Sequence, residues 1–168
     1  MLFDEEMMLL ALEEAKKAYN IGECPVGSLI IDGDENIIAT GYNRRETDNS
    51  PIAHAEIIAI EKAAAFKNTV TSPMGWRLND CTIYVTLEPC AMCAGAISNA
   101  GIKRVVYGAF NPKAGALASL FNLYEYPLNH IPLVRSRVLE QECGEILSRF
   151  FKKLRGGASV GQIQKTCI

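Results

Sequence analysis

The sequence predicts an α/β fold, a three-layer α/β/α sandwich with a central mixed five-stranded sheet. After an N-terminal helical segment come two β-branched runs around a Gly/Asp-rich turn, and short apolar strands then alternate with helical segments. Alternation of this kind places helices on both faces of a largely parallel sheet. The composition agrees, because 49% hydrophobic and 21% charged residues are typical of an ordinary globular domain.

The N-terminal part of the chain is expected to form a helix and then a hairpin. Asp4 is expected to cap the helix, which carries acidic residues in its first turn and lysines in its last, as the helix dipole favours. Gly22 is expected to end it. Two β-branched runs at 26–31 and 37–42 flank the Gly/Asp-rich segment 32–36, which is typical of a β-hairpin.

The rest of the chain predicts alternating strands and helices. Three further strands are expected at 82–86, 104–107 and 131–134, and three helices at 57–66, 91–100 and about 139–154. Pro73 and Gly75 interrupt residues 67–80, which we expect to form a loop. We therefore predict one domain over residues 1–155, followed by a flexible tail over residues 156–168.

The net charge and the hydropathy of the chain indicate which partners the protein can bind and in which cellular compartment it is expected. The formal net charge is −2, which gives no global attraction to nucleic acid, so a polyanion would have to bind a local basic patch. The chain contains no apolar run long enough to cross a bilayer, and after Phe3 it turns acidic instead of carrying the basic start of a signal peptide. We therefore expect a cytoplasmic protein with no membrane association.

Two short motifs contain candidate metal ligands: His-Ala-Glu at 54–56 and Pro-Cys-Ala-Met-Cys at 89–93. The imidazole of His54 and the thiolates of Cys90 and Cys93 are ligand types that zinc prefers. A structural zinc usually has four protein ligands, whereas a catalytic zinc keeps one position for water. The second histidine and the other cysteines lie apart from these motifs. A set of three ligands therefore predicts one catalytic Zn²⁺ per subunit.

The spacing of these residues restricts where two helices begin. Cys90 and Cys93 share one face of the first turn of a helix, where the positive end of the helix dipole stabilises both thiolates. Residues two apart in the middle of a helix point in different directions, so His54 and Glu56 can meet at one water molecule only if His54 stands at a helix start. We therefore expect that helix to begin at about Ala53 or His54.

Glu56 is the candidate general acid and base. Zinc lowers the pKa of bound water from 15.7 to about 7, and Glu56 would take the proton of that water and return it to the departing group. Other interpretations stay open, because a lone Cys-x-x-Cys also occurs in redox motifs and in zinc-stapled binding modules without activity. The lack of a fourth ligand and the nearness of Glu56 to His54 favour catalysis.

The order His-x-Glu followed by Pro-Cys-x-x-Cys is the signature of zinc-dependent nucleobase deaminases. From about Glu5 to Arg155 the chain further resembles the tRNA-specific adenosine deaminases, which convert the wobble adenosine of an anticodon to inosine. The matching stretches include Cys-Pro-Val-Gly at 24–27, Gly-Tyr-Asn-Arg at 41–44, residues 86–96, Asn-His at 129–130 and Phe-Phe at 150–151.

The resemblance implies a cytidine deaminase-like fold for the 1–155 domain, with zinc on the three candidate ligands and Glu56 as proton shuttle. It also implies that Asn43 hydrogen-bonds the flipped base, for which an amide offers both a donor and an acceptor. The alternative role for Asn43 is to cap a turn. The implied partners are a tRNA anticodon stem-loop and a second copy of the chain in a homodimer. An alternative with the same chemistry is deamination of a free base or nucleoside, such as guanine, cytosine or cytidine.

The chain departs from the family pattern at the expected RNA-contacting rim. The 67–80 loop is longer than in bacterial members, and Asn111 stands where many members carry an acidic residue. Basic residues gather on the last helix beside Phe150 and Phe151. They serve either as a phosphate-binding and stacking surface for RNA or as partners of the helix C-terminus, with the phenylalanines in the core.

Overall fold

The computed structural model describes residues 2–70 and 75–157. In chain order the elements are α1 (Phe3–Asn20), β1 (Gly27–Ile31), β2 (Ile37–Tyr42), α2 (Ala55–Val70), β3 (Thr82–Leu87), α3 (Ala91–Asn99), β4 (Arg104–Ala109), the 3-10 helix η1 (Leu123–Glu125), β5 (Leu133–Arg135) and α4 (Glu140–Gly157). Apart from Gly156 and Gly157, which end α4, the predicted tail lies outside the described residues. No helix in the described part of the chain has the length and apolar character needed to span a membrane.

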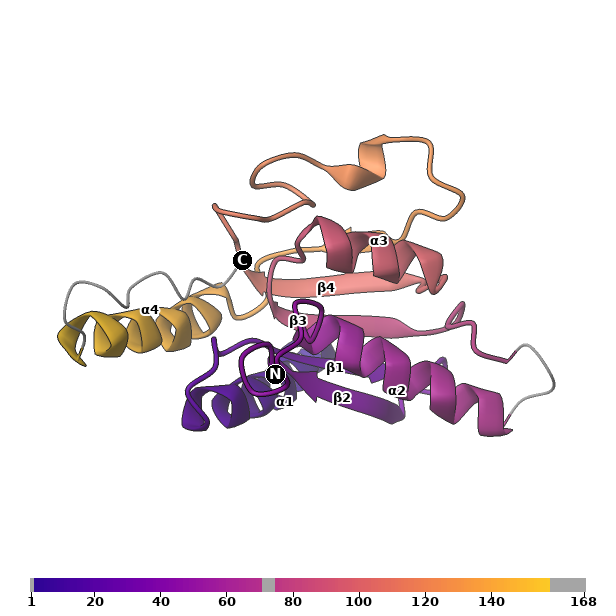
Figure 1. Ribbon diagram of the computed structural model, residues 1–168. Coiled ribbons are helices and arrows are strands. Elements are labelled where there is room, and N and C mark those ends of the chain that lie inside the picture. Colours follow the sequence, from indigo (N-terminus) through magenta and orange to yellow (C-terminus); the bar gives the residue numbers. More distant parts are fainter. Residues whose placement is uncertain (1, 71–74, 158–168) are drawn as a thin grey trace.

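The strands form one mixed sheet of five strands in the order β2-β1-β3-β4-β5. Strand β1 pairs antiparallel with β2 and with β3, whereas β3, β4 and β5 run parallel to one another. Helices α2 and α3 cover one face of this sheet and α1 and α4 cover the other (Figure 1). The predicted three-layer α/β/α sandwich with a mixed five-stranded sheet is therefore confirmed.

The central strands are buried on both sides, and their side chains alternate between two apolar layers. On β3, Tyr84 packs with α1 and α4, whereas its neighbours Ile83 and Val85 pack with α2 and α3. On β4, Val106 points to the first layer and Val105 to the second. This alternation gives the sheet one apolar surface for α1 and α4 and another for α2 and α3.

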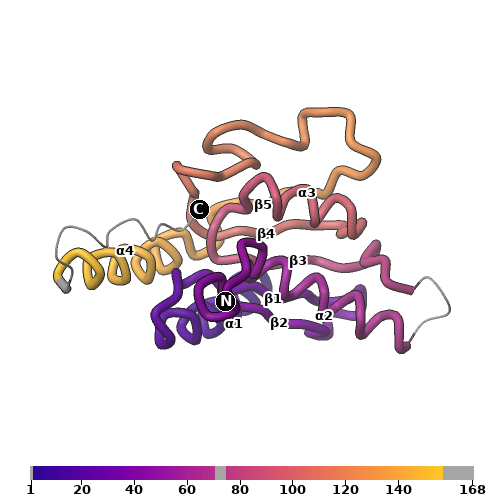
Figure 2. Tube along the Cα trace, viewed as in Figure 1, coloured from indigo at the N-terminus to yellow at the C-terminus, as the bar shows by residue number. Residues whose placement is uncertain are grey.

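The segment between β4 and β5 is long and leaves the sheet, as the orange part of the chain in Figures 1 and 2 shows. It passes beside α3, to which Tyr124 is joined by a hydrogen bond from its hydroxyl to the carbonyl of Ala94, 3.0 Å long. The first residues after β4 return to the end of β3, where Asn111 N–H donates to Glu88. The segment therefore forms part of the wall at the carboxyl end of the parallel strands, where ligands bind in folds of this kind.

Two local predictions are wrong. Asp4 does not cap α1, because the capping position is Leu2, whose backbone N–H donates to the Glu5 carboxylate over 3.2 Å. The Asp4 carboxylate is buried and instead accepts hydrogen bonds from Tyr84 and Arg104. The predicted loop also starts too early, because α2 continues to Val70 and takes up the first residues of the 67–80 segment.

Candidate metal centre

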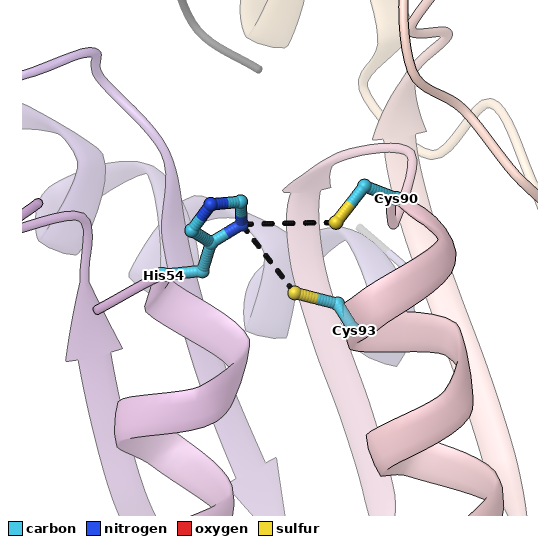
Figure 3. A group of neighbouring side chains, drawn as sticks. All are labelled: His54, Cys90 and Cys93. Atoms are coloured by element: carbon cyan, nitrogen blue, oxygen red, sulfur yellow. Dashed lines mark hydrogen bonds between the residues drawn. The ribbon is translucent and has the colours of Figure 1, made fainter. Parts of the chain in front are cut away.

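Three side chains from separate parts of the chain meet where α2 and α3 begin. The Nδ1 atom of His54 lies 3.8 Å from Sγ of Cys90 and 3.5 Å from Sγ of Cys93 (Figure 3). Zinc bonds of about 2.0–2.1 Å to nitrogen and about 2.3 Å to sulfur, at tetrahedral angles, set nitrogen–sulfur separations at about 3.6 Å. The spacing of these three atoms therefore fits one tetrahedral zinc ion.

The backbone explains how the three ligands come together. His54 immediately precedes α2, and its carbonyl accepts the first helical hydrogen bond from Ile58 N–H over 3.1 Å. The sequence places this start at about Ala53 or His54, and the helix begins one residue later, at Ala55. His54 thus has the irregular backbone that lets its side chain and that of Glu56 face the same space.

The second motif uses the start of α3. Cys90 is the capping residue, with an extended backbone, and Cys93 lies in the first turn, so both thiols face the helix N-terminus. A helix N-terminus carries a partial positive charge that stabilises thiolates. The predicted shared face of Cys90 and Cys93 is therefore present.

The surroundings of Cys90 favour its thiolate form. The Cys93 thiol hydrogen-bonds to Cys90, and together with His54 it lowers the pKa of Cys90 to about 4, against the effect of burial. The same hydrogen bond and burial raise the pKa of Cys93. Burial alone would lower the pKa of His54, but the negative charges of Cys90 and Glu56 raise it overall. The site thus attracts positive charge, which a divalent cation would supply.

The donor set fits a zinc ion that keeps a position open. In residues 2–70 and 75–157, the group of His, Cys, Asp and Glu ligand atoms at this place consists of His54, Cys90 and Cys93, all within 4.8 Å of one another. A structural zinc site would normally be closed by a fourth protein ligand. The described residues provide none, so the geometry favours a metal with access to a small molecule.

Glu56 stands beside this group on the first turn of α2. Its side chain is only 4% exposed, and burial raises the pKa of its carboxyl group even though the nearby His54 lowers it. A raised pKa makes a carboxyl group better able both to accept a proton and to return it. Its position beside the ligands agrees with the role predicted for it.

These residues line a cleft of about 350 Å³, a volume typical of small-ligand sites. Its walls come from the end of α1, the segments before β1 and α2, the end of β3 and the last helix. The lining residues are Ile21, Gly22, Glu23, Cys24, Val26, Asn43, Arg45, Glu46, Thr47, His54, Ala55, Glu56, Leu87, Glu88, Cys90, Asn111, Phe150 and Leu154. Asn43, predicted to contact the substrate, therefore shares one cleft with Glu56 and with two of the metal ligands, His54 and Cys90.

Two further carboxylates that line the cleft have partners that the sequence did not reveal. Glu23 is 2% exposed and accepts hydrogen bonds from Asn43 and Thr47. Glu88 accepts hydrogen bonds from the backbone N–H groups of Asn111 and Ser119. What could have drawn attention to these two acids in the sequence is their position. Glu23 directly precedes the Cys-Pro-Val-Gly motif, and Glu88 directly precedes the Pro-Cys-Ala-Met-Cys motif.

Comparison with known proteins agrees with this geometry. The family model for the cytidine and deoxycytidylate deaminase zinc-binding region matches residues 1–109. A tRNA-specific adenosine deaminase of Haemophilus influenzae is 49% identical over 154 residues, covering 91% of this chain and 86% of that protein. One of Bacillus subtilis is 48% identical over 153 residues, covering 90% and 91% respectively.

A solved structure gives the same result. It comes from a study of A-to-I editing by tRNA:A34 deaminases at the wobble position of transfer RNA, and it is 41% identical with a TM-score of 0.77. The match covers 84% of this chain and 99% of that chain. The chain belongs to the tRNA-specific adenosine deaminases, a family within the zinc-dependent cytidine and deoxycytidylate deaminases.

Proposed function

We propose that this protein is a zinc-dependent hydrolytic deaminase that converts adenosine to inosine at the wobble position of a tRNA anticodon. The observation that carries the proposal is a buried carboxylate, Glu56, beside a three-ligand zinc site on the wall of a cleft. The names of relatives that span nearly the whole chain support the choice of substrate. An anticodon loop presents unpaired bases, so moving one into a cleft costs little.

The reaction consumes water and adenosine and yields inosine and ammonia. One zinc ion per subunit, held by His54, Cys90 and Cys93, supplies when bound a Lewis acid that lowers the pKa of water to about 7. Glu56 takes a proton from the attacking water and delivers it to the purine ring nitrogen, and it then carries the remaining proton of the added hydroxyl to the leaving amine, so that ammonia departs as the carbonyl of inosine forms. Asn43 holds the base by hydrogen bonding.

The wall of the cleft formed by α4 supports binding of an RNA loop. Phe150 and Leu154 line the cleft, and Lys153 lies over the ring of Tyr19 with its Nζ atom 5.3 Å from the ring centre. Phe150 also packs edge-on against Tyr19, so it serves the core and the cleft wall at once. We propose that the exposed basic residues of α4 contact phosphates, since unpaired RNA bases are commonly bound beside aromatic and basic side chains. We also propose that the protein acts in the cytoplasm, because its proposed substrate is a tRNA.

A stem-loop RNA with adenosine at the wobble position tests the function. Inosine is measured by mass spectrometry after digestion to nucleosides. We expect the native chain to form inosine and Glu56→Gln to lower the rate by about 10²–10⁴-fold, the usual contribution of a general acid and base. Glu61→Gln, which changes an exposed carboxylate on the same helix, is the matched control and should be fully active. Turnover of free guanine, cytosine or cytidine without inosine formation would refute the proposal.

We also propose that the protein is a homodimer. Between β4 and the end of the edge strand β5 several large apolar side chains are exposed, namely Leu120, Phe121, Tyr126, Ile131 and Leu133. Such a concentration of apolar surface is typical of an interaction site. We expect Leu133→Glu to convert a dimer to a monomer in sedimentation velocity, whereas Ile37→Glu at the opposite edge of the sheet should leave it intact. A native chain that sediments as a monomer would contradict the proposal.

A further inference from the structure

The buried acid Glu23 has no part in the chemistry described above. We propose that Glu23 is a positioning residue, which fixes the side-chain amide of Asn43 so that its oxygen, Oδ1, faces the cleft as a hydrogen-bond acceptor. This inference rests on the proposed function, because it assigns a polarity to the atom that Asn43 presents to the substrate.

The contacts of the Asn43 amide nitrogen establish its orientation. Nδ2 of Asn43 donates to Oε2 of Glu23 and to the backbone carbonyl of Cys24, each over 3.3 Å. Both partners can only accept, so the amide group between them must be the nitrogen and not the oxygen. A flipped amide would place Oδ1 against two acceptors inside a region that excludes water, which is unfavourable.

Glu23 is itself held in place from its other side. Its Oε1 atom accepts hydrogen bonds from the backbone N–H of Thr47 over 2.6 Å and from the Thr47 hydroxyl over 2.7 Å. Its own backbone N–H donates to the carbonyl of Ala18 at the end of α1, 3.0 Å away. Glu23 therefore joins the end of α1 through its backbone, and the segment after β2 and Asn43 through its carboxylate, into one rigid group.

The remaining group of the amide is available to a ligand. Among the described residues Oδ1 of Asn43 accepts no hydrogen bond, and Asn43 lines the same cleft as His54 and Cys90. The residue as a whole is only 7% exposed, so its position depends on its neighbours and not on solvent. On the proposed adenosine substrate the groups that can donate to Oδ1 are the exocyclic amine of the base and the ribose hydroxyls, whereas the ring nitrogens of adenine are acceptors. The preference for such a donor originates at Glu23.

Exchanging the two functional groups tests this directly. Asn43→Asp keeps an acceptor at the cleft but sets a second carboxylate against Glu23, so kcat/KM for the stem-loop should fall at least 100-fold. Adding Glu23→Gln restores a donor–acceptor pair with the roles reversed and should recover at least tenfold of that loss. Adding Glu14→Gln instead, which removes a buried carboxylate that pairs with Lys17 on α1, should recover nothing. Equal zinc content and thermal stability in all variants exclude a merely structural effect.

A second measurement needs no substrate. In the native chain both side-chain amide protons of Asn43 should be protected from exchange with solvent in NMR spectra, and Glu23→Gln should remove that protection. The inference is overturned if Asn43→Asp is not improved by Glu23→Gln, or if Glu14→Gln improves it equally. It is also overturned if the amide protons exchange freely in the native chain. A native chain that forms no inosine refutes the proposed function instead, and the amide protons still decide the role of Glu23.

Discussion

The Glu88 carboxylate joins the first metal-binding cysteine to the wall of the cleft. It is 1% exposed and accepts backbone hydrogen bonds from Asn111, Leu117, Ala118 and Ser119 as well as one from the Ser119 hydroxyl. These contacts outweigh its burial and lower its pKa. Gly115 fits against it because a β-carbon there would lie only 2.3 Å from Oε2 of Glu88. A single ionised side chain therefore holds the whole 111–119 segment in place.

We expect Glu88→Gln to loosen that segment. An amide offers its NH₂ to groups that are themselves donors, so at least one buried N–H loses its partner. Loss of a hydrogen bond to a charged group typically costs about 1.5–3 kcal/mol, and we expect a decrease of that size in the free energy of unfolding by urea. Hydrogen exchange at residues 115–119 should accelerate. The exposed Glu61→Gln should change neither measurement, and unchanged exchange in Glu88→Gln would contradict the assignment.

The sequence predicted which side chains would meet at the candidate metal centre, because the spacing within each motif is local. Cys90 and Cys93 are recognisable from spacing alone, and His54 needed only a helix start nearby. The partners of Glu23 and Glu88 were not predictable in the same way. Glu88 and Ser119 lie 31 residues apart and Glu23 and Thr47 lie 24 apart, so only the folded chain brings them together.

Close packing of α2 on β2 determines where His54 and Glu56 stand. A β-carbon on Gly41 would lie 2.3 Å from the carbonyl oxygen of Ala55 and 2.9 Å from the backbone nitrogen of Ala59. These are backbone atoms of the first turns of α2, which cannot give way without moving the helix. The absence of a side chain at Gly41 is therefore a requirement of the metal centre as well as of the fold.

We expect Gly41→Ala to displace the start of α2 and weaken zinc binding. Overpacking of this kind costs about 1–3 kcal/mol, measured as the free energy of unfolding, and zinc affinity measured by competition with a chelator should fall in parallel. Gly144→Ala on α4 is the control, since nothing lies within 4 Å of the added carbon and helix propensity should raise stability by about 0.5–1 kcal/mol. Native zinc affinity in Gly41→Ala would show that α2 tolerates the carbon.

At the level of elements, every predicted strand and helix is present, and the errors have physical causes. The strand predicted at 104–107 continues to Ala109 because its last residues still pair with β3. The strand predicted at 131–134 is displaced to Leu133–Arg135, where pairing with β4 determines its bounds. Asp4 was misassigned because a capping rule is local, whereas its actual partners, Tyr84 and Arg104, follow 80 and 100 residues later.

The buried Asp4 carboxylate makes the stability of the whole molecule depend on pH. The hydrogen bonds from Arg104, together with Tyr84 and Arg135, lower the pKa of Asp4 to about 2 in spite of burial. Because the pKa is lower in the folded chain than in the unfolded chain, Asp4 stabilises the fold fully above its ordinary pKa. That contribution is lost as the pH falls through about 2, and a shift of this size corresponds to about 2 kcal/mol.

We therefore expect Asp4→Asn to be less stable than the native chain by about 2 kcal/mol at pH 6. The difference should shrink steadily between pH 5 and pH 2, because the native carboxylate becomes protonated there. Urea unfolding of both chains across this range, at constant ionic strength, measures it. A difference that is independent of pH would mean that Asp4 contributes by packing and not by charge.

Zinc connects parts of the fold that the chain itself leaves separate. His54 precedes α2 and Cys90 precedes α3, 36 residues later, so a metal bound to both holds the two helix starts together. A ligand that binds only the folded state stabilises it by about 4 kcal/mol at a free concentration 1,000 times its Kd.

We expect the unfolding midpoint in urea to rise with free zinc in the native chain and to fall when a chelator removes the zinc. His54→Ala, which lacks a ligand, should show no such dependence. If the native midpoint also failed to respond to zinc, the three side chains would not form a metal site in solution, and the hydrolytic role proposed for Glu56 would lose its basis.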